Sequence, residues 1–133
     1  MELVLALLAW IGGQTGLATP PPPSVLFVNA EQMLRLADGR VDVKGLYDSE
    51  AVTVYLRDDW DAADLRSRAS LLHELVHHVQ EFNRLPMRCR AERELLAYNL
   101  TLEWLRQQGA PDPHAVLDID DFTILIRAMC PDE

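Results

Sequence analysis

The stretch His73-Glu74-Leu75-Val76-His77 has the pattern H-E-x-x-H and lies inside the apolar run 71–82. On an α-helix, residues four apart lie on one face, with Cβ atoms about 5–6 Å apart. His73 and His77 can therefore bind one ion, at Zn–N distances of about 2.0–2.1 Å. Glu74 lies beside that ion, where its carboxylate can deprotonate a metal-bound water. The pattern predicts a metal-binding helix with Glu74 as general base.

This helix is expected to run from about Ala62 to Phe82, with Asp61 or Asp64 as its N-cap. Apolar residues cover much of its circumference, which indicates a buried helix: Leu65, Ala69, Leu71, Leu72, Leu75, Val76, Val79 and Phe82. Polar side chains on such a helix need partners, because an unpaired buried polar group costs a few kcal/mol. A metal ion would satisfy the two histidines and the glutamate together.

A catalytic zinc ion normally takes three protein ligands and one water, so a third ligand is needed. A third histidine at position 83 is absent. Glu92 and Glu94 are the candidates, and they point about 200° apart around an expected helix. Glu94 is favoured because the small Ala97, one turn on, lets the two helices approach closely. Glu92 shares its face with Arg88, which suits a solvated position.

Most of the remaining elements are also expected to be helical. Val52, Val54 and Leu56 alternate with polar residues, which is typical of a strand. We expect, in chain order, a helix over 30–37 capped by Asn29, a hairpin of strands 41–47 and 51–56, a helix over 91–108, and a helix from Asp118 or Asp120 through Met129. The hairpin either borders a substrate cleft or only covers the metal-binding helix. The fold class is therefore α+β, mainly α.

The N-terminus has the order of an export signal. Residues 3–11 are almost wholly apolar and small residues follow, which predicts a signal peptide over 1–18, cleaved after Ala18. The apolar run is too short to span a bilayer, and the basic residues usual at the start of a signal are missing. The alternative is an uncleaved helix packed on the domain. A proline-rich spacer, 19–24, then precedes one folded domain, 25–133.

The charge and the cysteine content limit the classes of partner and metal site that the chain can have. The chain has 12 basic and 21 acidic residues, a net charge of −9, so we expect no nucleic-acid partner. Two cysteines without a C-x-x-C pair exclude a thiolate zinc finger. If the chain is exported, it is secreted or periplasmic, and Cys89 and Cys130 are then candidates for a disulfide. The sequence predicts no oligomeric state.

The pattern His73-Glu74-x-x-His77 followed by Glu94-x-x-Ala97 resembles the gluzincin branch of zinc metallopeptidases. Residues 47–130, about two-thirds of the chain, are similar to a family of small, functionally uncharacterised bacterial proteins. The matching residues are His73, Glu74, His77, Cys89, Arg93, Glu94, Ala97, Tyr98, Trp104, Leu105 and Cys130. The resemblance implies a zincin-like domain with one Zn²⁺ per chain, held by His73, His77 and Glu94, and with Glu74 as general base.

The expected function is hydrolysis of a peptide bond, in a peptide or protein substrate, by a zinc-bound water. Two alternatives are a non-catalytic, zinc-stabilised binding module of the cell envelope and a metal-free helical protein anchored by its N-terminus. Four further polar residues have weaker expectations. His78 supports the ligands or faces solvent, and His114 is exposed in a proline-rich turn. Gln80 caps or solvates the helix end. Tyr98 packs in the core, or alternatively donates to an oxyanion.

Overall fold

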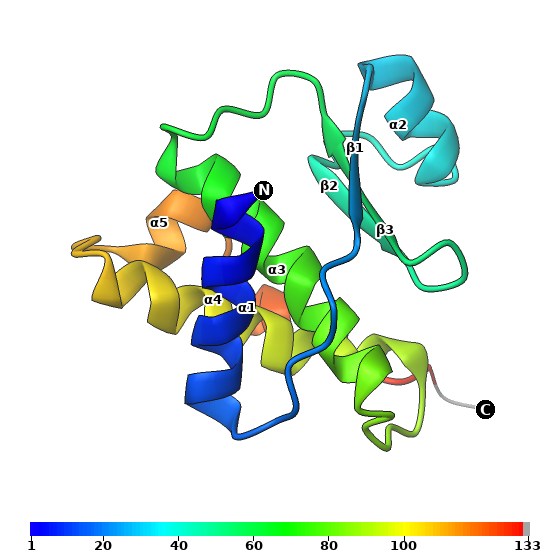
Figure 1. Cartoon of the computed structure of the whole chain (residues 1–133). Coiled ribbons are helices and arrows are strands. Elements are labelled where there is room, and N and C mark those ends of the chain that lie inside the picture. Colours follow the sequence, from blue (N-terminus) through cyan, green and yellow to red (C-terminus); the bar gives the residue numbers. More distant parts are fainter. Residues whose placement is uncertain (132–133) are drawn as a thin grey trace.

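The computed structural model describes residues 1–131; the end of the expected domain, 132–133, lies outside the described residues. The fold is α+β and mainly α, as predicted (Figure 1). Its elements in chain order are α1 (Glu2–Thr15), β1 (Ser24–Val28), α2 (Ala30–Leu36), β2 (Gly45–Asp48), β3 (Thr53–Arg57), α3 (Leu65–Phe82), the 3₁₀ helix η1 (Arg90–Glu92), α4 (Arg93–Gln107), α5 (Pro113–Leu117) and α6 (Asp121–Ala128).

Helix α3 lies at the centre of the molecule and contacts β2, β3, α1, α4 and α5. The Asp64 carboxylate accepts a hydrogen bond from the Ser67 backbone N–H at 3.0 Å, so Asp64 is the N-cap and the helix starts later than expected. The expected apolar positions are buried from Ala69 to Val79. Phe82 is the exception at 50% exposure, because it lies in a stretch, 81–88, that is mostly exposed.

The predicted hairpin is present, and it belongs to a sheet of three strands. Strands β2 and β3 pair antiparallel, while β1 pairs parallel with β3, which leaves β2 at an edge. The strand β1 was not expected from the sequence, and the first hairpin strand was expected too early, from residue 41. Asp42 has a φ of 61°, a left-handed conformation that interrupts an extended strand, so β2 starts at Gly45.

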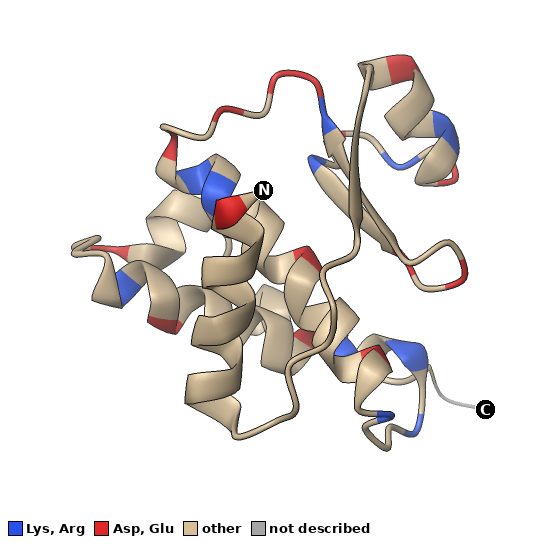
Figure 2. Ribbon diagram, in the orientation of Figure 1, with Lys and Arg blue, Asp and Glu red and all other residues tan. Residues whose placement is uncertain are grey.

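Helix α1 is part of the hydrophobic core. Its side chains Val4, Leu7, Leu8 and Ile11 are at most 3% exposed and α1 packs against α3. Figure 2 shows that α1 carries no charged residue after Glu2. This arrangement is the helix packed on the domain that the sequence left as an alternative, and cleavage after Ala18 stays a prediction. No helix within residues 1–131 combines the length and apolarity needed to cross a membrane.

The proline-rich segment lies along α3 as an extended strap. Pro20 and Pro23 are both buried, as expected for one face of a polyproline II helix with three residues per turn. His78 Nε2 donates to the Pro21 carbonyl at 2.7 Å, and its Nδ1 accepts from the Tyr47 hydroxyl at 2.8 Å. His78 is only 5% exposed, so the expectation that it supports the metal ligands or faces solvent is wrong. Its ring instead joins the strap to β2.

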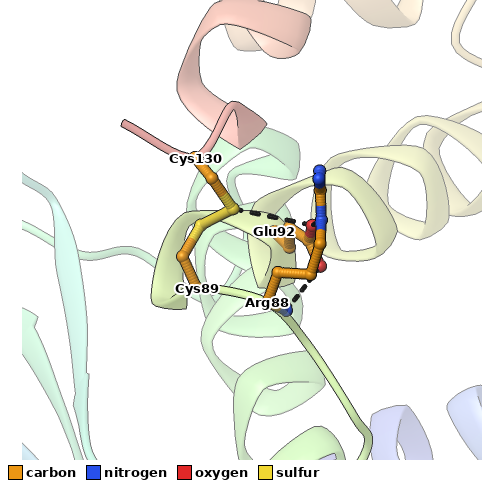
Figure 3. The surroundings of a disulfide bond; sticks show 4 residues. All are labelled: Arg88, Cys89, Glu92 and Cys130. Atoms are coloured by element: carbon orange, nitrogen blue, oxygen red, sulfur yellow. Dashed lines mark hydrogen bonds and ion pairs between the residues drawn. A yellow bond between two sulfur atoms is a disulfide. The ribbon is translucent and has the colours of Figure 1, made fainter. Parts of the chain in front are cut away.

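The C-terminal part contains one more helix than expected. Pro113 begins α5, with Asp112 as N-cap, where the sequence had suggested only a turn. Asp120 caps α6 by accepting from Thr123 N–H at 2.7 Å. A disulfide joins Cys89 and Cys130, the predicted pair, and it links the start of η1 to the segment just after α6 (Figure 3).

Candidate metal centre

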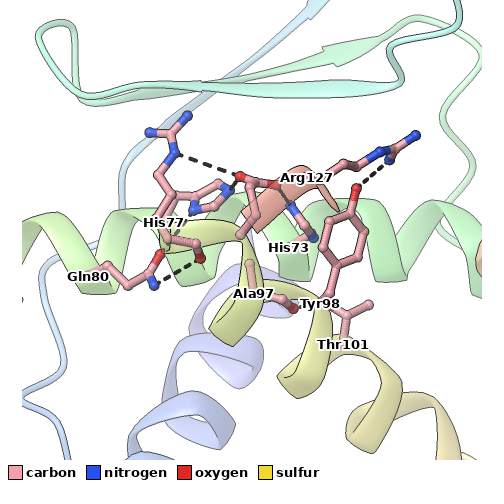
Figure 4. A network of polar contacts seen from close by, with 9 residues as sticks. His73, His77, Gln80, Ala97, Tyr98, Thr101 and Arg127 are labelled. Carbon is pink, nitrogen blue, oxygen red and sulfur yellow. Dashed lines mark hydrogen bonds and ion pairs between the residues drawn. The ribbon is translucent and has the colours of Figure 1, made fainter. Parts of the chain in front are cut away.

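Three of the predicted residues converge on one point. His73 and His77 project from the same face of α3, and Glu94 lies in the first turn of α4. The Glu94 carboxylate is 2.7 Å from His77 Nε2 and 3.1 Å from His73 Nε2 (Figure 4). The three donor atoms all lie within 4.8 Å of one another, so this group could hold a metal ion.

Close contact between α3 and α4 brings Glu94 to the histidines. Ala97, one turn after Glu94, is fully buried, as is Thr101 one turn further on. The Thr101 hydroxyl donates to the Ala97 carbonyl at 2.7 Å, so this polar side chain is satisfied inside the interface. The small residue at position 97 was the sequence signal for this approach, and the structure places it there.

Glu92 lies elsewhere and does not reach the histidines. Its carboxylate accepts hydrogen bonds from the Arg88 backbone N–H at 2.9 Å and from Arg88 Nε at 2.5 Å (Figure 3). The Cys130 sulfur approaches Glu92 at 3.5 Å, but a disulfide sulfur has no proton, so this is a contact rather than a hydrogen bond. Of the two candidate third ligands, the geometry therefore supports Glu94.

Gln80 belongs to the site, and the expectation that it caps or solvates the helix end was wrong, because it is only 5% exposed. Its amide oxygen accepts from His77 Nδ1 at 3.0 Å, and its NH₂ donates to the Arg93 carbonyl at 3.1 Å. The proton on Nδ1 leaves His77 Nε2 with a lone pair for a metal ion, an arrangement common around metal-bound histidines. The signal in the sequence was the spacing: residues three apart on a helix are neighbours.

Glu74 lies between α3 and the edge strand β2. A Cβ atom added to Gly45 would be 3.3 Å from Glu74 Cγ, so the side chain passes directly over the start of β2. Among residues 1–131, the Glu74 carboxylate has no hydrogen-bond or ion-pair partner. A partly buried carboxylate without a protein partner beside the histidines is available to act on a bound water or substrate.

Two more residues border the cluster on the His73 side. The Tyr98 ring packs edge-on against the His73 ring, with centroids 4.6 Å apart and planes at 64°. Arg127 of α6 donates from Nη1 to the Tyr98 hydroxyl oxygen at 2.6 Å (Figure 4). The expectation that Tyr98 packs in the core was wrong: it is half-buried at the edge of the metal centre.

The electrostatics of the cluster favour a cation. Burial opposes ionisation of Glu94, but hydrogen bonds from His73 and His77 outweigh it and hold the pKa of Glu94 far below its ordinary value. For His73, burial lowers the pKa, but the hydrogen bond to Glu94 and the charge of Glu74 outweigh burial and raise it. The cluster therefore presents an ionised Glu94 carboxylate beside two imidazoles, a set of groups that can bind a cation.

His114 is remote from this cluster. It lies in the first turn of α5, with a side chain 41% exposed, and forms an ion pair with Asp121 at 2.7 Å. His114 is partly buried as a whole residue, so the expectation of exposure holds only for its side chain, and the residue lies in a helix rather than in a turn. Its exposure makes it a suitable control histidine.

Comparison with known families places the chain in a single family. The match extends over residues 1–133, and the family is described as "Domain of unknown function (DUF6647)". The chain belongs to the DUF6647 family. Neither the curated proteins nor the solved structures give a significant match to it. The description of DUF6647 states no activity, so the functional argument rests on the chemistry of the site.

Proposed function

We propose that this chain is a zinc-dependent peptidase of the gluzincin type. The observation that carries the proposal is the convergence of His73, His77 and Glu94 beside the unpaired carboxylate of Glu74. A purely structural metal site needs no base at that position. The resemblance of the sequence to gluzincins supports the same assignment of roles.

The donor set fits zinc. Two imidazole nitrogens and one carboxylate oxygen are the ligands of a common class of catalytic zinc site, which keeps its fourth position open. Glu94 Oε1 lies 2.7 Å from His77 Nε2 and Glu94 Oε2 lies 3.1 Å from His73 Nε2, so both imidazoles already face the same carboxylate and the three residues would hold the ion together. Imidazole ligands also favour zinc over calcium or magnesium, which prefer oxygen.

The residues of the chain would divide the reaction as follows. When bound, zinc supplies a Lewis acid that acidifies water and polarises a carbonyl group. Glu74 accepts the proton of the attacking water and passes it to the nitrogen of the leaving amine. Gln80 keeps the His77 ring in the orientation that presents Nε2 to the ion. Arg93 Nε lies 3.7 Å from a carboxylate oxygen of Glu94, within ion-pair distance.

The position of β2 supports a peptide as the substrate class. β2 is an edge strand, and a Cβ atom added to its first residue, Gly45, would lie 3.3 Å from Glu74 Cγ, so Glu74 lies close to the start of this strand. An exposed strand edge can pair with an extended peptide through backbone hydrogen bonds. A peptide bound in this way would run past the general base. In this proposal the hairpin borders the substrate site and does not only cover α3.

We also infer that the chain is exported, to the periplasm or outside the cell. The Cys89–Cys130 disulfide supports this inference, because structural disulfides persist mainly in oxidising compartments. The proposal can be checked by comparing free-thiol labelling of the chain taken from its producing cell with that of the reduced protein. Complete labelling before reduction would contradict it.

The direct test of the function is hydrolysis of a mixed peptide library by the zinc-loaded full chain, with Glu74→Gln as the inactive variant. Removal of a general base typically lowers a rate 10²–10⁴-fold. Glu81→Gln is the matched control, because Glu81 lies on the same helix but is exposed. A zinc-loaded protein that cleaves no peptide, or one whose cleavage is unchanged in Glu74→Gln, would leave only a zinc-stabilised binding module.

A further inference from the structure

We propose that the Tyr98 hydroxyl donates a hydrogen bond to the oxygen of the substrate carbonyl, and that Arg127 positions the hydroxyl for this role. The inference rests on the proposed function. It adds a catalytic residue and a positioning residue to the metal centre, on the His73 side.

The first observation is the position of the Tyr98 side chain beside His73. The Tyr98 ring packs on a proposed metal ligand, with its centroid 4.6 Å from that of His73. The two residues come from different helices, α4 and α3, and Figure 4 shows their side chains next to each other. The phenol therefore borders the proposed ligand set, where a molecule bound to the metal would also lie.

The second observation is the direction of the hydrogen bond at the phenol. A guanidinium group can only donate, so the Tyr98 oxygen is the acceptor of the 2.6 Å bond from Arg127. The phenolic O–H is then free to donate, and no residue within 1–131 accepts from it. A phenol is protonated at neutral pH, since its ordinary pKa is about 10.

The third observation is the anchoring of Arg127. The residue lies in the last turn of α6, whose Ile124 is buried and whose end is tied by the Cys89–Cys130 disulfide to the segment before α4. The guanidinium also lies 5.9 Å from the centre of the Tyr98 ring. The Arg127 side chain is exposed, but its two contacts come from a helix whose end is covalently tethered and act on the phenol before substrate binds, and a preformed donor needs little reorganisation during the reaction.

These contacts give Tyr98 a chemical role. In peptide hydrolysis the carbonyl oxygen gains negative charge in the transition state, and a hydrogen-bond donor aimed at this oxygen accelerates the reaction. A neighbouring cation polarises the O–H group and makes it a stronger donor. A ring with only a packing role against His73 would need neither the hydroxyl nor its guanidinium partner.

The test uses the full chain loaded with Co²⁺, whose visible absorption reports on the ligands of the metal, and acetohydroxamic acid as the probe. The probe binds metal through two oxygens and needs no knowledge of the peptide specificity. The variants are Tyr98→Phe, Arg127→Gln and Arg127→Lys, with Tyr55→Phe and Arg106→Gln as matched controls. Tyr55 lies on β3, and Arg106 pairs with Glu103 at the surface.

We expect Tyr98→Phe to take up cobalt like wild type but to bind the probe about tenfold more weakly, the effect of one lost hydrogen bond. Arg127→Gln should weaken probe binding several-fold, and Arg127→Lys should restore most of it. With a cleaved peptide, the loss in Tyr98→Phe should appear in kcat rather than in KM. The controls should match wild type.

Three results would overturn the inference, and they differ from one another. Normal cobalt uptake with unchanged probe binding in Tyr98→Phe would remove the role of the hydroxyl while leaving the metal site intact. Loss of cobalt uptake in Tyr98→Phe would mean that the Tyr98 hydroxyl is needed to hold the ligand His73 and not to bind the substrate. Absence of cobalt uptake in wild type would overturn the proposed function, and this inference with it.

Discussion

Glu92 and Glu94 carry the same side chain two residues apart, yet they serve different parts of the molecule. Glu94 accepts from two histidines, whereas Glu92 accepts from Arg88 at the surface. We predict that Glu94→Gln lowers zinc affinity at least tenfold, because the carboxylate is replaced by a neutral ligand. Glu92→Gln should leave it unchanged. Competition with a chromophoric chelator measures both, and equal affinities for the two variants would contradict the assignment.

Gln80 supports the site through its hydrogen bond to His77 Nδ1. We predict that Gln80→Met, which keeps the volume but removes both polar atoms, lowers zinc affinity 10- to 100-fold. Gln108→Met is the control, because Gln108 is exposed at the end of α4. The same chelator competition applies. An unchanged affinity in Gln80→Met would show that His77 is oriented by packing alone.

At the residue scale, the sequence predicted those site residues whose positions follow from spacing along a single helix. His73 and His77 follow from four-residue spacing on one helix, and Glu94 from the small Ala97 on its own face. Arg127 could not be found in this way. Its contact with Tyr98 spans 29 residues and depends on how α6 packs, which no periodicity in the sequence encodes.

At the scale of elements, the contact between β2 and α3 sets the position of Glu74, the proposed general base. A Cβ at position 45 would press on Glu74 Cγ at 3.3 Å and on Leu56 Cδ2 at 3.4 Å. We predict that Gly45→Ala lowers kcat for peptide hydrolysis about tenfold, because small misplacements of catalytic groups are costly, while zinc content stays the same. Gly13→Ala, on α1 with open space at its Cβ, is the control. Full activity in Gly45→Ala would contradict a role for Glu74 at this contact.

Long periodic elements were predicted well, and short or non-local ones were not. α3 and α4 have apolar positions that repeat along most of their length, so their packing was readable from sequence. β1 is only five residues long, and it pairs with β3. Each β1 residue pairs with a residue 29 positions later in the chain, as Ser24 does with Thr53. α5 is also five residues long. Such elements form because tertiary contacts stabilise them, and helices this short are not stable alone.

At the scale of the whole molecule, the packing of α1 bears on whether the N-terminus is cleaved after Ala18 or retained as part of the fold. Val4, Leu7, Leu8 and Ile11 are nearly fully buried, and burial of each such side chain contributes about 1.5–3 kcal/mol. Their sum is comparable with the whole stability of a typical domain, about 5–15 kcal/mol. We predict that a chain lacking residues 1–18 unfolds at much lower denaturant concentration or aggregates. A truncated chain as stable as the full one would instead support cleavage after Ala18.

The fold class was predictable for the whole molecule, but the role of its first helix was not. The sequence of an apolar run such as 3–11 does not distinguish a signal peptide from a core helix, because both are removed from water and both need apolar side chains. What distinguishes them is the surface against which the run packs, here α3. The strap at Pro20 and Pro23, with its bond from His78 to Pro21, depends on that same packing.

The central claim is that His73, His77 and Glu94 hold one zinc ion, and elemental analysis of the purified full chain tests it most directly. Wild type, His77→Ala and the control His114→Ala are purified in parallel without chelator. We expect about one zinc per chain in wild type and in His114→Ala, and a large loss in His77→Ala, which removes one of three ligands. No zinc in wild type, even after zinc is added back, would contradict the metal centre and the peptidase built on it.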